Sequence, residues 1–485
     1  MLVVLGCTPF EGRAAPRDDL GDAAALDAHD APTGFDDTHE ARISDDTHDA
    51  VARDAPRAGR VAMEPWDFDG DGFDDVALSG GAYVYVFRGG PAGLRETADL
   101  RLTGPDGGAE LGEALQHLGD LDGDGDDELA VGASERSAPR VFLFRGARAP
   151  ATTPSQVISP PDGDGRSFGE SLAAGDFNSD GRIDLAVGSW FWSGQIGRVC
   201  VYYATASGLP ATPDVILRCP SPTVAANRFG LTLSCPGDTN GDDVDDLVVG
   251  SPLIDNHTGA AWVFLGSTRG LREESSVRLN APRTGEGFGG CLAGVGDVNG
   301  DGLGDIAVCS PEGGNRSGRL SLFHGGRPTP PSEPATSFVL PFGVGAGLAR
   351  ITPLGDLDGD GYADLATSLY TAPNGTRLGL LGFFRGGPEG VGTTATHALS
   401  RATQADSFGM GAAVVGDVRG VGAWDLVVGA YLHPNWDQIG RAYYFRAGDP
   451  WPRTPQTVLE SPERRAGARF GYTIVSPLIS VRSAR

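Results

Sequence analysis

The sequence predicts an all-β protein, a seven-bladed β-propeller with calcium-binding loops. Three observations predict this fold class. An acidic pattern of nine residues recurs seven times, apolar stretches are short and lie between Gly, Pro, Asp and Asn, and glycine occupies 74 of 485 positions. Short apolar stretches bounded by turn residues indicate strands, and a regular period of this size indicates a repeat architecture.

The acidic pattern marks seven units along the chain. Its copies begin at residues 67, 120, 176, 238, 297, 356 and 417, so successive copies start 53 to 62 residues apart. They read DFDGDGFDD, DLDGDGDDE, DFNSDGRID, DTNGDDVDD, DVNGDGLGD, DLDGDGYAD and DVRGVGAWD. Each unit is therefore expected to form one small supersecondary structure that packs against its neighbours.

Each unit also carries the signals of four short strands. One apolar stretch follows the acidic pattern directly, as in DLAVGS and DLVVGSP, and another comes ten to fifteen residues later, as in AYVYVFRGG and GRVCVYYA. A Phe-Gly or Leu-Gly pair precedes most copies by eight or nine residues, at 111, 168, 229, 288 and 408. With one weaker strand before the next pair, each unit supplies the four antiparallel strands of a propeller blade.

The Phe-Gly pair, the DxDxDGxxD loop and the Gly-Ser/Ala-Pro-like end of the next strand together resemble the FG-GAP repeat of integrin α-subunit propellers and their bacterial relatives. The resemblance covers roughly residues 60–475. It implies a propeller of FG-GAP repeats that binds its partner on the face away from the calcium loops. The chain has no large inserted domain between units, so the resemblance does not extend to an inserted metal-dependent ligand site.

The alternating oxygen-bearing residues of each copy predict a cation site. Ca²⁺ takes six to eight oxygen ligands, whereas Mg²⁺ requires a stricter octahedron. We expect side-chain ligands at positions one, three, five and nine, a backbone carbonyl at position seven, and a turn at position six, where Gly181 stands in the third copy. The expected donors are Asp67, Asp69, Asp71, Phe73 and Asp75; Asp120, Asp122, Asp124, Asp126 and Glu128; Asp176, Asn178, Asp180, Arg182 and Asp184; Asp238, Asn240, Asp242, Val244 and Asp246; Asp297, Asn299, Asp301, Leu303 and Asp305; and Asp356, Asp358, Asp360, Tyr362 and Asp364.

An EF-hand or dockerin loop is the alternative for a segment that begins DxDxDG. Such loops need a bidentate acid at position twelve and flanking helices. Position twelve carries no acid in any copy, and a predicted strand follows at once; the residues there are Leu78, Val131, Val187, Val249, Val308, Thr367 and Val428. The pattern therefore favours structural calcium loops on a β scaffold.

The seventh copy departs from the ligand pattern. Arg419 and Val421 stand where oxygen donors are needed, so we expect this loop to bind no metal and Arg419 to pair with Asp417 or Asp425. The other copies predict about six Ca²⁺ ions. These six loops contain 21 ligand carboxylates, and six divalent ions bound to them would move the formal charge from -26 to about -14. Six closed loops on a repeated scaffold indicate structural bracing, because a catalytic metal usually keeps an open position.

The first 59 residues have no propeller signals. Residues 1–7, MLVVLGC, resemble a truncated lipoprotein signal ending in a lipobox, so Cys7 is a candidate for lipidation; an ordinary apolar segment is the alternative. Residues 8–59 have the composition of a disordered acidic linker. Its histidines, at 29, 39 and 48, fit a solvated tether better than a metal site. We place the propeller at 60–477 and a tail at 478–485.

The remaining cysteines leave the disulfides open. Cys291 and Cys309 flank one acidic loop, so adjacent antiparallel strands could join them, and Cys200 and Cys219 could bridge a hairpin with Cys235 unpaired. Connectivity does not follow from sequence alone. Reduced, buried cysteines are the equal alternative.

Two further features concern the ends of the ring and its second face. FGYTIVSP at 470–477 starts like another unit but has no acidic loop, so we expect one terminal segment to complete a blade that contains the other terminus. The loops away from the acidic face include SWFWSGQIG and AYLHPNWDQIG. Aromatic residues on loops often serve recognition, although packing against a neighbouring blade is the alternative. The candidate ligand-binding residues are Trp190, Phe191, Trp192, His433, Asn435 and Trp436.

Composition and motifs bound the function. A formal charge of -26 argues against a nucleic-acid partner, and no HExxH motif occurs. We expect a non-enzymatic adhesion or recognition module that binds a protein or a glycan, extracellular or anchored to an outer membrane only through Cys7. The alternatives are a carbohydrate-binding propeller and a propeller enzyme that acts on polysaccharides.

Overall fold

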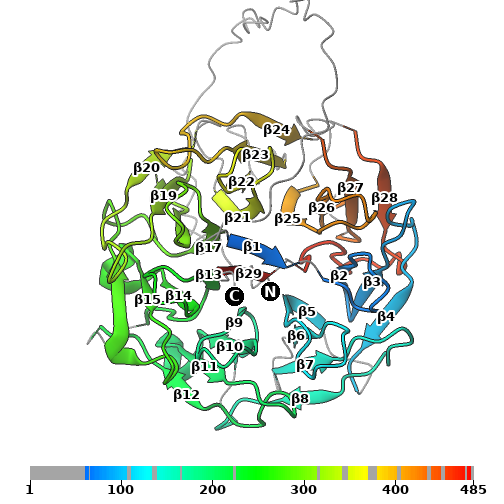
Figure 1. Cartoon of the computed structure of the whole chain (residues 1–485), viewed down its shortest axis with the longest axis horizontal. Coiled ribbons are helices and arrows are strands. Elements are labelled where there is room, and N and C mark those ends of the chain that lie inside the picture. Colours follow the sequence, from blue (N-terminus) through cyan, green and yellow to red (C-terminus); the bar gives the residue numbers. More distant parts are fainter. Residues whose placement is uncertain are drawn as a thin grey trace, which may run out of the picture.

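The computed structural model describes residues 61–64, 66–105, 111–133, 139–163, 166–221, 226–313, 317–340, 348–369, 379–400, 406–433, 438–448, 454–475 and 478–481. Within these ranges the chain forms a ring of seven small antiparallel sheets (Figure 1). The expected all-β, seven-bladed propeller is confirmed. The helices whose bounds lie within these ranges are single turns, α1 (Trp192–Gln195), α2 (Ile254–His257) and the 3₁₀ turn η1 (Glu273–Ser275).

Six blades have four strands each, ordered from the axis outward as the chain runs. They are blade 2, β5 (Leu111–His117), β6 (Leu129–Ala133), β7 (Arg140–Phe144) and β8 (Gln156–Ile158); blade 3, β9 (Leu172–Gly175), β10 (Asp184–Ser189), β11 (Arg198–Tyr202) and β12 (Val215–Leu217); blade 4, β13 (Leu233–Gly237), β14 (Asp246–Ser251), β15 (Ala260–Phe264) and β16 (Ser276–Leu279); blade 5, β17 (Cys291–Gly296), β18 (Asp305–Ser310), β19 (Arg319–Phe323) and β20 (Thr336–Val339); blade 6, β21 (Leu348–Gly355), β22 (Asp364–Leu369), β23 (Leu380–Phe384) and β24 (His397–Ser400); and blade 7, β25 (Phe408–Val414), β26 (Leu426–Ala430), β27 (Arg441–Phe445) and β28 (Thr457–Glu460).

Blade 1 is completed by the other end of the chain. Its own strands are β2 (Val76–Gly80), β3 (Tyr83–Phe87) and β4 (Leu100–Thr103). Residues 470–475 lie beside β2 as the inner strand: the Gly471 N–H donates to the Ser79 carbonyl at 2.9 Å, and the Ser79 N–H donates to the Thr473 carbonyl at 3.0 Å. The expected closure of the ring by a terminal segment is confirmed.

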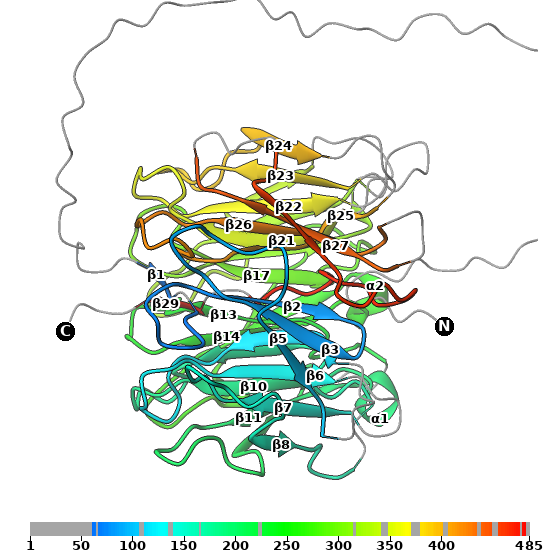
Figure 2. The same cartoon turned by 90° about the vertical axis from the view of Figure 1, so that its right-hand side faces the viewer.

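A second contact joins the two ends of the described chain. β1 (Val61–Glu64) pairs antiparallel with β29 (Leu478–Val481), and this ribbon lies in the middle of the ring (Figure 1). It lies at the side of the disc opposite α1 and α2 (Figure 2). The predicted boundary at 477 is therefore too early: Leu478–Val481 is a strand and not part of a tail, because its backbone pairs with β1 and Leu478 packs against the core of blades 2 and 3.

The core consists of layers between adjacent blades. One cluster joins Val141 and Leu143 of blade 2 to Leu185 and Val187 of blade 3, and equivalent clusters join the other neighbours around the ring. The strand that follows each acidic loop is buried on both faces, which explains its continuous apolar sequence. Removing this apolar surface from water is the main stabilising term, about 25 cal/mol per Å² buried.

The glycine of the Phe-Gly pair makes a close contact between blades. A Cβ built on Gly429 of β26 would lie 1.8 Å from the carbonyl oxygen of Gly471 in blade 1, so only glycine permits this approach. The Gly471 N–H meanwhile pairs within its own blade. The contact between Gly429 and Gly471 therefore sets how closely the sheets of blades 7 and 1 approach at this point.

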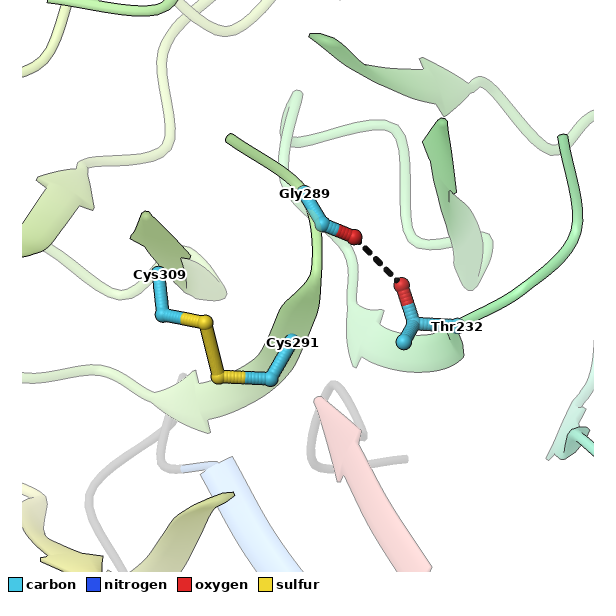
Figure 3. The surroundings of a disulfide bond; sticks show 4 residues. All are labelled: Thr232, Gly289, Cys291 and Cys309. Atoms are coloured by element: carbon cyan, nitrogen blue, oxygen red, sulfur yellow. Dashed lines mark hydrogen bonds between the residues drawn. A yellow bond between two sulfur atoms is a disulfide. The ribbon is translucent and has the colours of Figure 1, made fainter. Parts of the chain in front are cut away.

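One disulfide links the inner two strands of blade 5. Cys291 of β17 and Cys309 of β18 are direct partners in the ladder, with Cα atoms 5.2 Å apart. Beside them the Thr232 hydroxyl of blade 4 donates to the Gly289 carbonyl at 3.0 Å (Figure 3). Of the two expected pairings, 291–309 is confirmed. Cys200 and Cys219 are free thiols, since Cys200 is opposite Ile216 in the ladder.

Candidate metal-binding loops and the opposite face

The acidic loops, numbered here by blade, lie on one face of the disc. Loops 2 to 7 each connect the first and second strands of a blade, and loop 1 follows β1. Position six has a left-handed backbone in every loop, with φ of 83° at Gly181 and 64° at Asp243. Glycine adopts this conformation at low cost, whereas Asp243 does so as a short polar residue that tolerates it.

Hydrogen bonds turn the side-chain oxygens of loop 3 inward. The Asp176 carboxylate accepts from the N–H groups of Asp180 at 3.1 Å and Gly181 at 2.8 Å. The Asn178 side-chain oxygen also accepts from the Asp180 N–H, at 2.9 Å, and Asp180 accepts from the Arg182 N–H at 3.0 Å. Loops 4 and 5 repeat these contacts. The odd-numbered positions therefore share one concave side, as the sequence predicts.

The donor set fits a hard cation. In loops 1, 2 and 6 three acidic residues bring ligand oxygens within 4.8 Å of one another; they are Asp67, Asp69 and Asp71; Asp120, Asp122 and Glu128; and Asp356, Asp358 and Asp360. Asp69 is 4% exposed, and its Oδ1 atom has no hydrogen-bond partner among the described residues. Carboxylate oxygens this close repel one another unless a cation lies between them. Oxygen-only donors are the chemistry of Ca²⁺.

The carboxylate at position nine connects the loop to its blade. Asp184 is fully buried and accepts from the Phe177 N–H at 3.1 Å and the Ala204 N–H at 2.8 Å, which joins the loop to the turn after the third strand. Burial raises the pKa of Asp184 to about 8, and the hydrogen bond from Ala204 opposes this rise. The sequence predicts a metal ligand here; the structure adds a structural role that fixes the loop.

Loop 7 contains a cation from the protein itself. The Arg419 guanidinium contacts Asp425 through two hydrogen bonds of 3.0 Å each. The pairing expected from sequence is confirmed with Asp425. The Asp417 carboxylate accepts from the N–H groups of Val421, at 2.8 Å, and of Gly422.

The loops of neighbouring blades are also joined to one another. The Asp127 carboxylate of loop 2 accepts from the Asp67 N–H of loop 1 at 3.0 Å, and the Asp245 carboxylate of loop 4 accepts from the Asp176 N–H of loop 3 at 2.9 Å. Backbone bonds make the same link elsewhere, as from the Gly304 N–H to the Asp238 carbonyl. These position-eight contacts were not predicted, because they depend on how one blade meets the next.

The opposite face carries the aromatic turns. In blade 3 the Trp190 indole is 8% exposed, donates to Glu170 at 2.6 Å, and lies under the Arg228 guanidinium of the next blade at 5.0 Å. Packing against the neighbour, the alternative raised from sequence, therefore holds for Trp190. Phe191 and Trp192 are only partly buried, which leaves ring surface open to solvent.

Charged groups and a strained backbone accompany Trp192. Its indole donates to Asp162 at 3.0 Å and the Arg198 guanidinium lies 4.8 Å from the ring centre. Ser193 has a φ of 51° and Gln195 a φ of 74°, a left-handed turn of the kind that costs energy in non-glycine residues and is often found at functional sites. α2 of blade 4 has the same left-handed turn.

The two groups of predicted ligand-binding residues do not meet. Trp190, Phe191 and Trp192 belong to blade 3, whereas His433 belongs to blade 7, on another part of the ring (Figure 1). Asn435 and Trp436 lie outside the described residues. The two aromatic loops belong to blades that are not neighbours in the ring, so their residues do not form a single site.

A cavity of about 260 Å³ lies among the inner strands of the ring. Its polar lining residues include Glu113, Glu170 and Arg350. Leu478 and Ile479 of β29 also line it, so the central ribbon forms part of its wall.

Comparisons with known proteins agree with this geometry. Residues 120–187 match the FG-GAP-like repeat family and residues 292–323 match the FG-GAP repeat family. The chain is 30% identical over 220 residues to integrin alpha pat-2 of Caenorhabditis briggsae, covering 41% of this chain and 18% of that protein. It is 38% identical over 157 residues to integrin alpha-PS5 of Drosophila melanogaster, covering 30% of this chain and 15% of that protein. The chain thus spans less than a fifth of the length of these curated relatives.

A solved structure of a Lactobacillus plantarum protein has a similar fold. It has a TM-score of 0.50 and 15% identity, covering 82% of this chain and 98% of that one. The chain contains FG-GAP repeats and has an integrin-α-like β-propeller. None of the helices in the described part of the chain has the length and apolar character to span a membrane.

Proposed function

We propose that this chain is a non-enzymatic adhesion or recognition module, braced by Ca²⁺ on one face and binding its ligand on the other. The observation that carries the proposal is the separation of the two faces. Oxygen donors gather at the loops between first and second strands, whereas strained turns with partly exposed aromatic rings lie at the other end of the same sheets. Similarity to integrin α-subunits supports a protein ligand.

Calcium would brace the ring by neutralising the acidic loops. Asp69 and the carboxylates at position nine are buried, and the mutual repulsion of the loop carboxylates opposes folding unless a cation is bound. Extracellular calcium modules typically bind with a Kd of roughly 0.1 to 1 mM. The loops would then be filled outside a cell.

A melt in calcium and in chelator tests the bracing. We expect excess EDTA to lower the Tm by several degrees, because a ligand that binds only the folded state stabilises it by mass action. Calcium added back should restore the Tm, and magnesium should do so less well. An identical Tm in EDTA and in millimolar calcium would contradict the proposal.

The proposed ligand surface is the turn of blade 3. Phe191 and Trp192 present ring surface, and the Asp162 carboxylate, 43% exposed, lies beside it. Replacing Phe191 and Trp192 by Ala should weaken capture of a surface or matrix protein at least tenfold with an unchanged Tm. Val421→Ser, which changes an exposed apolar residue on the acidic face, is the matched control.

A glycan is the second candidate ligand. A partly exposed indole beside an exposed carboxylate is also suited to stacking on a sugar ring and bonding its hydroxyl groups. Binding to a glycan array that is lost in Trp192→Ala would favour this alternative. Binding to protein that survives deglycosylation would favour the first.

An anchor at the N-terminal side would orient the faces. β1 enters the ring at the side opposite α1 and α2 (Figure 2). A tether through residues 8–59 to a lipid on Cys7 would then hold the acidic face toward the membrane and turn the aromatic face outward. Radiolabelled palmitate incorporated into the wild type but not into Cys7→Ser would test the anchor.

A further inference from the structure

Three arginines each hold the position-three aspartate of an acidic loop. In blades 1, 2 and 6 the residue directly after the third strand is an arginine, and each contacts the position-three aspartate of its own blade. The contacts are Arg88 Nε to Asp69 Oδ2 at 3.0 Å, Arg145 Nη1 to Asp122 Oδ2 at 2.7 Å, and Arg385 Nη1 to Asp358 Oδ2 at 2.9 Å.

Loops 3, 4 and 5 lack both members of this pair. Position three is an asparagine in each, and the residue after the third strand is not an arginine. The corresponding residues are Asn178 with Tyr203, Asn240 with Leu265, and Asn299 with His324. Within this chain, every aspartate at position three is accompanied by an arginine after the third strand of the same blade.

The pairing gives the side chains at positions one, three, five and nine the same net charge in every cation loop when the arginine is counted with them. Four carboxylates and one arginine have a net charge of three negative, and so do three carboxylates and an asparagine. Blade 7 uses a third arrangement, in which position three is Arg419 itself and pairs with Asp425. Charge at position three is therefore balanced in all seven blades.

The arginine also leaves one carboxylate oxygen directed to the cation. In blades 1 and 2 the guanidinium occupies Oδ2, whereas Oδ1 of Asp69 and Oδ1 of Asp122 are buried and have no hydrogen-bond partner among the described residues. Those residues belong to the two acidic groups whose oxygens converge within 4.8 Å. A carboxylate held at one oxygen has its other oxygen fixed for coordination.

We propose that Arg88, Arg145 and Arg385 set the cation affinity of their loops, by cancelling the fourth carboxylate charge and by positioning Oδ1 of the aspartate. This inference rests on the proposed calcium bracing. The six loops then bind with similar affinity although their ligand sets differ. Without the arginine, the extra negative charge would attract a divalent ion more strongly and would repel its neighbours more strongly when no ion is bound.

Calcium titration by equilibrium dialysis tests the inference. Wild type should titrate as one class of six sites. In the variant Arg88→Gln, Arg145→Gln and Arg385→Gln, three sites should bind about tenfold more tightly at low ionic strength, while three stay unchanged. Adding Asp69→Asn, Asp122→Asn and Asp358→Asn should return all six to one class.

Arg446→Gln is the matched control. Arg446 also follows a third strand, but its guanidinium donates to the Ala92 carbonyl at 2.8 Å and its loop has no position-three carboxylate. It should leave the isotherm unchanged. A second readout is the melt: the triple arginine variant should be less stable than wild type in chelator and should gain more from calcium.

The outcomes separate the two proposals. If wild type binds calcium and the triple arginine variant gives the same isotherm, the arginines do not set affinity and the inference is wrong, while calcium bracing stands. If wild type binds no calcium, both are wrong. If the triple variant does not fold, the single variant Arg145→Gln replaces it, because the Arg145 side chain is 57% exposed. The calcium affinity of one site of the six must then change, or the inference is wrong.

Discussion

Arg419 and Asp425 form a two-point ion pair inside loop 7, with Nε 3.0 Å from Oδ2 and Nη2 3.0 Å from Oδ1. Asp425 is fully buried and also accepts from the Ala447 N–H at 2.7 Å. In loop 3 the equivalent Asp184 accepts two backbone N–H groups. The guanidinium thus supplies, from the chain itself, the positive charge that the other loops are expected to take from an ion.

Loop 7 should become a metal site with two changes. Arg419→Asn and Val421→Asp convert DVRGVGAWD to DVNGDGAWD, which has the ligand pattern of loop 5, DVNGDGLGD. We expect bound calcium, measured by mass spectrometry of the metal after dialysis, to rise by one ion per chain. Val421→Asp alone keeps the guanidinium at the site and should add none. An unchanged count in the double variant would show that the loop pattern is not sufficient.

The closing strand should be needed for the whole ring. Truncation after residue 467 removes the inner strand of blade 1 and leaves the N–H of Ser79 without its partner at Thr473. We expect the domain to lose its cooperative melt in calorimetry, because an open edge exposes the cores between blades 7 and 1. Truncation after residue 475 removes β29 but keeps the closing strand, so it should cost less. Equal melts for the first truncation and the wild type would contradict closure.

Repetition explains what the sequence could predict. Seven copies of one pattern fix the blade count, and the order of loop and strand fixes which face carries the acids, because each blade repeats the same local rules. Arg419 could be matched to Asp425 for the same reason, since both belong to one nine-residue loop. Local pairs within a repeated unit can be predicted from the unit alone.

Contacts between distant segments could not be predicted in this way. Val61 pairs with Val481 across almost the whole chain, and nothing near either residue signals the other. The burial of Trp190 depends on Arg228 of the next blade. Arg88 and Asp69 belong to the same blade, but they form an ion pair only because the strand register brings the end of the third strand beside the acidic loop. An arginine after the third strand was the available signal, visible only when the seven units are aligned.

The disulfide should contribute measurably to stability. It joins cysteines 18 residues apart in sequence, and closing a loop of that length in the unfolded chain is worth about 3 kcal/mol. Replacing Cys291 and Cys309 by Ser should lower the free energy of unfolding in urea by roughly that amount, and dithiothreitol should have the same effect on wild type. Cys200→Ser removes a buried free thiol and should leave the response to dithiothreitol intact. A wild type insensitive to dithiothreitol would count against the bond.

Glu170 should make stability depend on pH. Burial raises the pKa of Glu170 from 4.5 to about 7, a hydrogen bond from Trp190 opposes the rise, and Glu113 adds to it. The folded protein therefore keeps a proton that the unfolded chain releases above pH 4.5, so this contribution is fully present below pH 4.5 and is lost as the pH rises through about 7.

Glu170→Gln isolates this contribution, because its amide oxygen can still accept from Trp190 and has no proton to lose. In saturating calcium, which keeps the acidic loops ionised, the Tm of the variant should match or fall below that of wild type at pH 5 and exceed it at pH 8. Glu274→Gln, at a 73% exposed side chain, is the control and should follow wild type at both values. Parallel curves for Glu170→Gln and wild type from pH 5 to 8 would mean that the buried carboxyl ionises without cost.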